Sequence, residues 1–384
     1  MRKRLVIVGP AWPYRGGPPT YVGYLFDSLS RDYDVKVVNF ARLYPDFLFP
    51  GTTQYDESRD LKKHTPSERI IDSINPLSWA RAAKEVLNFK PDLVIVDWYN
   101  PFFGPCLYDI TRRVKQGSDA RIVYITENVI SHEARLVDAM LTRVGLRHAD
   151  AFIALADKVA QELAHFAGGR GVYRSELPIF DLFAAKQFNK EDERRQLGYT
   201  ADDKVILFFG YVREYKGLDV LLRAMPTILQ KDPNVKLLIA GEFYQKESMY
   251  RNLIAELDLN NAVQVYNKFI PNEDVGRFYA LSDFVALPYK SATQSGILTV
   301  AYSFKRPVLV TDVGGLAEFV ESGRTGLVVA PNEPAALAQG ALDMFSLLER
   351  QPLDEHITDW MERSTFGDIN KVIGGILQDF DASR

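Results

Sequence analysis

Short apolar runs alternate with amphipathic stretches through the first half of the chain. The runs predict buried strands at Leu5–Val8, Val35–Phe40, Leu93–Val96, Ile122–Ile125 and Ala151–Leu155. Helical spacing of apolar residues at Thr20–Leu29 and Pro76–Asn88 predicts helices between them. Strands that alternate with helices in this way are typical of a parallel sheet covered by helices on both faces.

The same pattern restarts at Lys204 and predicts a second sheet. Its strands are expected at Val205–Phe209, Lys236–Ala240, Val263–Tyr266, Phe284–Leu287 and Val308–Val310. We therefore predict an α/β protein of two doubly wound Rossmann-like domains that face each other across a cleft. The expected divisions are 1–180, 181–350 and a helical tail at 351–384 that can cross back to the N-terminal domain.

Composition narrows the class of protein. The net charge of −4 argues against non-specific nucleic-acid binding, although residues 1–180 carry +3 and the remainder −7. The single cysteine, Cys106, excludes an intrachain disulfide. No apolar run approaches the ~20 residues of a membrane span. We expect a cytoplasmic protein, and contact with the inner face of a membrane is left open.

Two nucleotide-binding motifs are missing from the chain. The first predicted strand leads into Gly9–Gly17, which is not a Gly-x-Gly-x-x-Gly sequence, so a nicotinamide dinucleotide site is not expected. No Gly-x4-Gly-Lys-Ser/Thr sequence occurs either, which excludes a P-loop enzyme.

Three segments of the second half carry candidate chemistry. In Phe208–Asp219 a strand ends at Gly210, a loop presents Arg213 and Lys216, and a helix begins near Leu218. Two cations at this edge of a sheet suit a diphosphate, and a solvated basic loop is the alternative. In Leu287–Thr299 a turn of small residues leads into a helix near Gly296, whose free amides can bind phosphate. Glycine pairs in the third segment, Val310–Val329, permit close approach of the backbone.

In order and spacing these segments resemble the donor domain of retaining glycosyltransferases of the GT-B fold, family 4, the group 1 glycosyltransferases. The resemblance covers about residues 200–335. It implies that Arg213 and Lys216 hold the diphosphate of a nucleotide-sugar donor beside Gly210. It also implies that backbone amides of the turn bind the distal phosphate, the residues there being Ser295, Gly296, Ile297 and Leu298.

The N-terminal half matches more loosely. Gly16 and Gly17 stand where the family has a glycine-rich loop that faces the donor phosphates, and Pro18 and Pro19 follow. At the end of a later strand, Glu127 stands where many members place a histidine beside the transferred sugar. Glu127 can contact sugar hydroxyls or the acceptor, or simply cap the following helix. His132 is a weaker candidate for the same role.

The chain departs from the family at a pair of acids. Most members carry Glu-x7-Glu, but here the corresponding positions fall near Ala292–Gln294 and at Val300, and neither is acidic. Gln294 can hydrogen-bond a sugar hydroxyl, whereas Val300 cannot hold a ribose. Two alternatives follow: either the affinity for the nucleotide is lower, or the ribose is recognised from elsewhere, with Glu242 after Gly241 as a candidate.

The resemblance implies transfer with retention of configuration, in which the leaving diphosphate accepts the proton of the acceptor. No bound metal or cofactor is then expected beyond the donor itself. The acceptor, a glycan or a lipid-linked molecule, is expected on the N-terminal domain. Two aromatic loops there, 44–50 and 98–103, can stack on sugars or insert at a bilayer interface, or can be buried packing.

Three alternatives remain open. A phosphorylase of this fold requires a lysine-bound pyridoxal cofactor and a much longer chain. An epimerase requires a cluster of histidines and carboxylates, and only five His occur. A non-catalytic nucleotide- or glycan-binding protein is favoured by the missing Glu-x7-Glu pair.

Overall fold

The computed structural model describes residues 2–49, 51–59, 63–130, 137–244, 246–363 and 369–382. The chain forms two compact units. Unit 1 comprises Met1–Asp56, Lys63–Pro178 and Phe366–Arg384, and unit 2 comprises Glu57–Lys62 and Ile179–Thr365. The last helix, α13 (Ile369–Ala382), therefore belongs to unit 1, where it packs on α1 (Gly17–Leu29).

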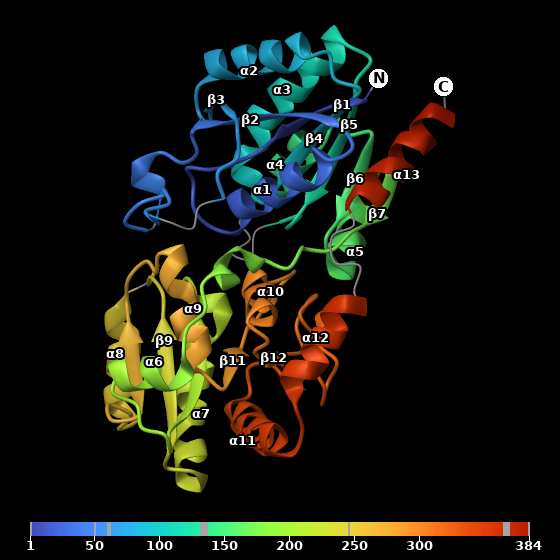
Figure 1. The fold of residues 1–384 in the computed structure, drawn as a ribbon. Helices are drawn as coiled ribbons and strands as arrows, with labels where there is room; N and C mark the ends of the chain where they lie inside the picture. The colour runs from blue at the N-terminus through green and yellow to red at the C-terminus, as the bar shows by residue number, and fades with distance from the viewer. Residues whose placement is uncertain are drawn as a thin grey trace. The chain divides into compact units, whose positions relative to one another are not determined.

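Unit 1 is built on a seven-stranded parallel sheet of order β3-β2-β1-β4-β5-β6-β7 (Figure 1). The strands are β1 (Arg4–Val8), β2 (Asp34–Arg42), β3 (Glu68–Asp72), β4 (Leu93–Trp98), β5 (Arg121–Thr126), β6 (Ala151–Ala154) and β7 (Gly171–Arg174). The remaining α-helices of the unit are α2 (Pro76–Asn88), α3 (Gly104–Gly117), α4 (Asp138–Gly145) and α5 (Asp157–Ala167). Residues of β4 are buried throughout, because helices cover both faces of the sheet at its centre.

Unit 2 has the same type of architecture, built on a six-stranded parallel sheet of order β10-β9-β8-β11-β12-β13. Its strands are β8 (Lys204–Phe209), β9 (Val235–Ala240), β10 (Val263–Tyr266), β11 (Phe284–Leu287), β12 (Val308–Thr311) and β13 (Gly326–Val329). Its α-helices are α6 (Lys190–Gln196), α7 (Leu218–Lys231), α8 (Glu247–Glu256), α9 (Asn272–Leu281), α10 (Gly296–Ser303), α11 (Pro334–Arg350) and α12 (Leu353–Arg363).

The predicted fold class of two Rossmann-like α/β domains is confirmed, and all ten strands expected from the sequence are present. Three strands were missed: β3, β7 and β13. Each lies at an edge of its sheet and is only partly buried. β3 and β7 lack the continuous apolar run of a central strand, whereas β13 has only the short run Leu327–Val329.

One helix prediction needs correction. Helix α1 begins at Gly17 and not at Thr20, because Pro18 and Pro19 occupy its first turn, where a missing N–H costs no helical hydrogen bond. The tail forms two helices, α12 and α13, which belong to different units.

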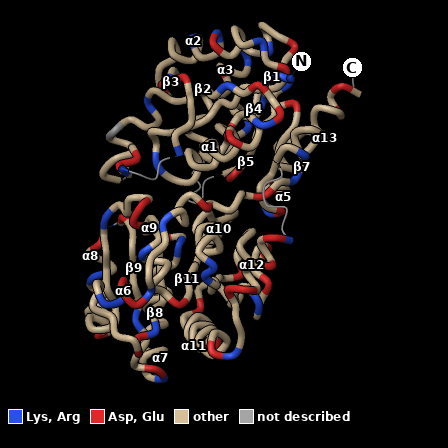
Figure 2. Tube along the Cα trace, in the orientation of Figure 1, with Lys and Arg blue, Asp and Glu red and all other residues tan. Residues whose placement is uncertain are grey.

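Basic and acidic positions are interspersed along the elements of both units (Figure 2), so the uneven charge of the two halves does not appear as a single-sign face in this view.

Candidate functional site

The candidate site of unit 2 lies at the carboxyl edge of its sheet. The first strand of this sheet, β8, lies between β9 and β11, so the chain winds away from it in both directions. Ligands of doubly wound sheets bind at such a switch point. The segments that follow β8, β9, β11 and β12 therefore form one neighbourhood.

Two glycines bring backbone together after β8 and β9. Gly210 and Gly241 have φ of 94° and 146°, and a Cβ on Gly241 would lie 2.1 Å from the carbonyl oxygen of Gly210. A Cβ on Gly210 would lie 3.4 Å from Lys216 Nζ and 3.1 Å from Ile297 Cδ1. The end of β8, the Lys216 ammonium and the start of α10 therefore converge on one point. Glu242 is buried directly after Gly241.

The loop that carries Lys216 is fixed against the end of β11. Lys216 ends a short 3-10 helix, η4 (Glu214–Lys216), and Gly217 follows with φ of 68°. A Cβ on Gly217 would lie 1.9 Å from Pro288 O, and Lys290 N donates to Tyr215 O at 2.6 Å. The cation is thus positioned by backbone contacts that do not involve its own side chain.

Lys216 is a buried cation, with 7% of its surface exposed. Burial and the neighbouring Arg213 lower the pKa of Lys216 from 10.5 to about 7. Within the described ranges it has no carboxylate partner; its Nζ lies 5.6 Å from the ring centroid of Tyr289. Arg213 is half-buried, with its guanidinium 4.8 Å from the ring centroid of Tyr244. Such an arrangement of cations suits an anionic ligand.

The amino end of α10 supplies free amides beside this cation. Ser295 precedes the helix without capping it, and its Oγ lies 3.2 Å from Tyr289 Oη. Leu298 N already donates to Ser295 O at 3.1 Å, so the amides of Gly296 and Ile297 are the better donors to a ligand. Gln294 Oε1 is buried without a hydrogen-bond partner, and Val300 is buried as an apolar residue of the helix.

Gly314 and Gly315, which follow β12, pack against the turn that precedes α10. Gly315 N donates to Thr293 O at 3.1 Å. Gly314 has φ of 55°, and a Cβ there would lie 1.6 Å from Ala292 O. The turn at 292–295 is therefore held by backbone that tolerates only glycine.

Substitution Gly314→Ala is expected to destabilise unit 2 by about 2 kcal/mol, since it combines left-handed strain with a clash against a carbonyl oxygen. The measurement is urea unfolding followed by circular dichroism. Gly323→Ala is the matched control, because Gly323 has φ of 80° but open space around its Cβ position. Equal losses in the two variants would mean that the contact with Ala292 is unimportant.

In unit 1, Gly16 and Gly17 stand where the loop after β1 enters α1. Gly16 has φ of 107°, and Thr20 N donates to Gly16 O at 3.3 Å. Pro18 and Pro19 have no amide hydrogen, so Gly17 supplies the one amide of the helix's first three residues. Gly16 and Gly17 therefore form a helix start that is poor in amide donors, and the phosphate contact expected of them stays a prediction.

Glu127 lies directly after β5 and is buried, with 8% of its surface exposed. Burial raises its pKa to about 8. Sequence reasoning missed its neighbour Asp97, near the end of β4, although a single acid in the apolar run of that strand was the available signal. His132 lies outside the described residues.

The two aromatic loops are mainly packing. Tyr44 stacks on Phe102 with ring centroids 5.4 Å apart and contacts Phe103 at 5.1 Å, and Trp98 is fully buried. At the tip of the first loop, however, Phe47 is 84% exposed. Burial thus accounts for most of these rings, and the exposed tip is the exception.

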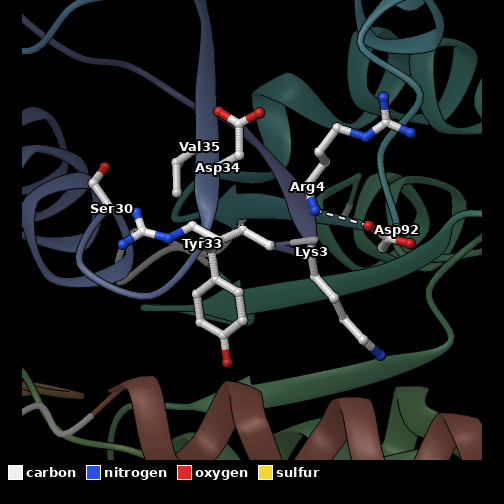
Figure 3. Close-up of a pocket in the computed structure, with 8 residues that line it drawn as sticks. Lys3, Arg4, Ser30, Tyr33, Asp34, Val35 and Asp92 are labelled. Atoms are coloured by element: carbon white, nitrogen blue, oxygen red, sulfur yellow. Dashed lines mark hydrogen bonds between the residues drawn. The ribbon is translucent and has the colours of Figure 1, made fainter.

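A cavity of about 820 Å³ lies at the opposite, amino-terminal edge of the unit 1 sheet (Figure 3). Its lining carries both positive and negative side chains. The backbone N of Arg4 donates to Asp92 Oδ2 at 2.7 Å, and Lys3 forms an ion pair with Asp381 at 2.6 Å. Because this edge is not the one that binds ligands in doubly wound sheets, the cavity is not a candidate for the active site.

Within the described ranges, no helix has both the length and the apolar character that crossing a bilayer requires. The same ranges hold no group of three or more His, Cys, Asp or Glu side chains that could bind a metal ion.

The second unit matches a protein family. Residues 203–346 fit the model described as "Glycosyl transferases group 1". A D-inositol 3-phosphate glycosyltransferase from Corynebacterium efficiens is 33% identical over 153 residues, which are 38% of this chain and 36% of that protein. The chain spans less than half the length of the first curated relatives that it matches.

Solved structures match both units. Sucrose-phosphate synthase from Thermosynechococcus elongatus has a TM-score of 0.77 at 17% identity, covering 100% of both chains. HepE from Anabaena in complex with UDP has a TM-score of 0.74 at 19% identity, covering 98% of this chain and 100% of that chain. The chain therefore has the GT-B fold, and residues 203–346, which hold the Lys216 site, match the group 1 glycosyltransferase family.

Proposed function

We propose that the protein transfers a sugar from a nucleotide-diphosphate sugar to a glycan or lipid-linked acceptor, with retention of anomeric configuration. The observation that carries the proposal is Lys216, a buried cation without an anionic partner in the described chain, beside the free amides of α10. A diphosphate would supply the missing negative charge. The family match of the same residues supports this choice of anion.

The proposed donor site lies wholly in unit 2. Arg213 and Lys216 bind the diphosphate, and the amides of Gly296 and Ile297 bind its distal phosphate at the positive end of the helix. Gly210 keeps the approach open, since a side chain there would press on Lys216 and Ile297. Gln294 contacts a sugar hydroxyl through its unpartnered oxygen, and Glu242 is proposed for the ribose.

Catalysis in this proposal is positioning and electrostatic stabilisation. As the bond between the sugar and the diphosphate breaks, negative charge grows on the leaving oxygen, where Lys216 and Arg213 stabilise it. The acceptor hydroxyl gives its proton to the leaving diphosphate while its oxygen bonds to the anomeric carbon. Unit 1 is proposed to bind the acceptor, and the exposed tip at Phe47 is proposed to contact a membrane when the acceptor is lipid-linked.

The test is a calorimetric titration with UDP, GDP and ADP and their common sugar conjugates, without added metal. We expect micromolar binding of one series, which the double variant Arg213→Ala, Lys216→Ala abolishes. Nuclear magnetic resonance of the product then reports whether the anomeric configuration is retained. Binding that survives the double variant would place the donor elsewhere.

A non-catalytic binding protein is the second candidate, and Val300 is the observation that favours it. Val300 is buried and apolar where the resembling family carries a ribose-holding acid, and it offers no hydrogen bond to a ribose. Failure of all three nucleoside diphosphates to bind would select this candidate.

A further inference from the structure

Tyr289, which follows β11, contacts both parts of the candidate site in unit 2. Its ring centroid lies 5.6 Å from Lys216 Nζ, and its hydroxyl lies 3.2 Å from Oγ of Ser295, the residue directly before α10. The residue is buried, with 3% of its surface exposed. A single phenol therefore links the buried cation to the turn that carries the free amides.

Contacts other than the hydroxyl hold Tyr289 in place. Thr311 Oγ1 donates to its carbonyl oxygen at 2.6 Å, and the ring of Tyr215 meets its ring edge to face, with centroids 6.0 Å apart. Burial raises the pKa of Tyr289 well above its ordinary value, so the phenol keeps its proton. The hydroxyl is thus a fixed and neutral group that shares a hydrogen bond with Ser295.

Ser295 occupies the position from which a serine ordinarily caps a helix. Its backbone is extended, with φ of −143° and ψ of 114°, and its carbonyl oxygen accepts from Leu298 N at 3.1 Å. A serine in this place usually turns its hydroxyl to accept from the amide two or three residues further on. Here the side chain makes no such bond, and its Oγ is directed to Tyr289 instead.

The amide that this arrangement leaves open is that of Ile297. Leu298 N already bonds the Ser295 carbonyl, so Ile297 N is the partner that the Ser295 hydroxyl would take as a cap. In the part of the chain that the structure describes, neither Gly296 N nor Ile297 N donates a hydrogen bond. The side-chain rotamer of Ser295 therefore decides whether Ile297 N is capped or open.

A buried cation lies beside the open amide. Lys216 exposes 7% of its surface and forms no ion pair within the described ranges. A Cβ on Gly210 would lie 3.4 Å from Lys216 Nζ and 3.1 Å from Ile297 Cδ1, so the cation and the first turn of α10 border the same space. An uncapped helix start and an unpaired cation are both satisfied by one anion in that space.

We propose that Tyr289 is a positioning residue whose hydroxyl holds the Ser295 side chain away from α10, so that Ile297 N stays open for an anionic ligand. Tyr289 itself touches no ligand. Only the identity of the anion, the distal phosphate of the donor, rests on the proposed function. The hydrogen bond between Tyr289 and Ser295 is what keeps the anion site uncapped in the free protein.

The first measurement needs no ligand and uses the full chain. Tyr289→Phe removes the hydroxyl and keeps the ring, so Ser295 is free to cap Ile297. Selective 15N labelling of isoleucine reports the solvent exchange of the Ile297 amide by nuclear magnetic resonance, and Ile297→Val assigns the signal. We expect exchange to slow about two- to thirtyfold in Tyr289→Phe, the range expected for an N-cap hydrogen bond. In the Ser295→Ala background the same substitution should change exchange less than twofold.

The second measurement is calorimetry of the same variants with inorganic pyrophosphate, UDP, GDP and ADP. Tyr289→Phe should weaken binding of the anion by a similar factor, because the new cap must first be displaced. The loss should disappear when Tyr289→Phe is compared with its parent in the Ser295→Ala background. Tyr279→Phe is the matched control, since Tyr279 is fully buried in the same unit and its hydroxyl is buried without a hydrogen-bond partner. It should change neither reading.

Unchanged exchange of Ile297 in Tyr289→Phe would overturn the proposal. So would a loss of anion affinity that persists in the Ser295→Ala background, because a merely structural role of Tyr289 would not depend on that hydroxyl. Slowed exchange with unchanged anion affinity would place the anion away from Ile297 and would also overturn it. The expected exchange together with no binding of any probe would uphold the control of Ser295 by Tyr289 and contradict the proposed donor site, so the two failures are distinguished.

Discussion

The variant Lys216→Met is expected to lower sugar transfer about a hundredfold or more, mainly through kcat. Lys216 is buried beside Gly210 and the start of α10, where it can meet the charge that develops on a leaving diphosphate. Removing one preorganised electrostatic contact in a water-poor site typically costs this much. Met keeps the length and apolar stem of the side chain, so packing against Tyr289 should be retained. Steady-state kinetics with the donor identified by calorimetry make the measurement.

The matched control is Lys231→Met, at the exposed carboxyl end of α7. It also removes one positive charge from unit 2, but at the amino-terminal edge of the sheet, just before β9, so kcat should change less than twofold. Thermal unfolding checks that both variants are folded. Full activity of Lys216→Met would contradict the assignment of the diphosphate to this cation.

The grouping of the candidate residues in unit 2 could be predicted from the sequence, because they follow strands that the sequence also predicts. Apolar runs locate the ends of β8 and β11, and parallel strands place those ends at one edge. Arg213, Lys216 and Gly296 then fall into one neighbourhood by topology alone. What the sequence could not show is the burial of Lys216, which depends on Gly217 packing against Pro288 from another strand end.

The proximity of Asp97 and Glu127 in unit 1, in contrast, could not be predicted from the sequence. Asp97 lies inside an apolar run, and its significance depends on the register of β4 with β5, which brings Glu127 beside it. Register between strands 30 residues apart leaves no trace in the pattern of either strand. The start of α1 was misplaced for a related reason: Pro18 and Pro19 suggest a loop, yet both fit the first turn of a helix.

Donor binding is expected to weaken as the pH rises above about 7, by up to tenfold per pH unit. In the free protein the pKa of Lys216 is about 7, against an ordinary value of 10.5. A bound diphosphate favours the ammonium form and raises that pKa, so above pH 7 each binding event takes up a proton. Below about pH 6 the diphosphate itself becomes protonated, since its last pKa is about 6. Affinity should therefore be greatest between about pH 6 and 7.

Calorimetry in two buffers of different ionisation enthalpy measures this proton uptake directly. We expect close to one proton per nucleoside diphosphate at pH 8.5–9, and none in Lys216→Met, whose affinity should be lower but nearly independent of pH above 7. The stability of the free protein provides an independent check with the opposite sign. Because the pKa of Lys216 is lower in the folded chain than in the unfolded one, the unfolded chain binds more protons between about pH 7 and 10.5, and the contribution of Lys216 to stability rises with pH in that window. A wild type whose donor affinity is flat from pH 7 to 9 would show that Lys216 is either fully charged before binding or not in contact with the diphosphate, and the kinetics of Lys216→Met would decide between the two.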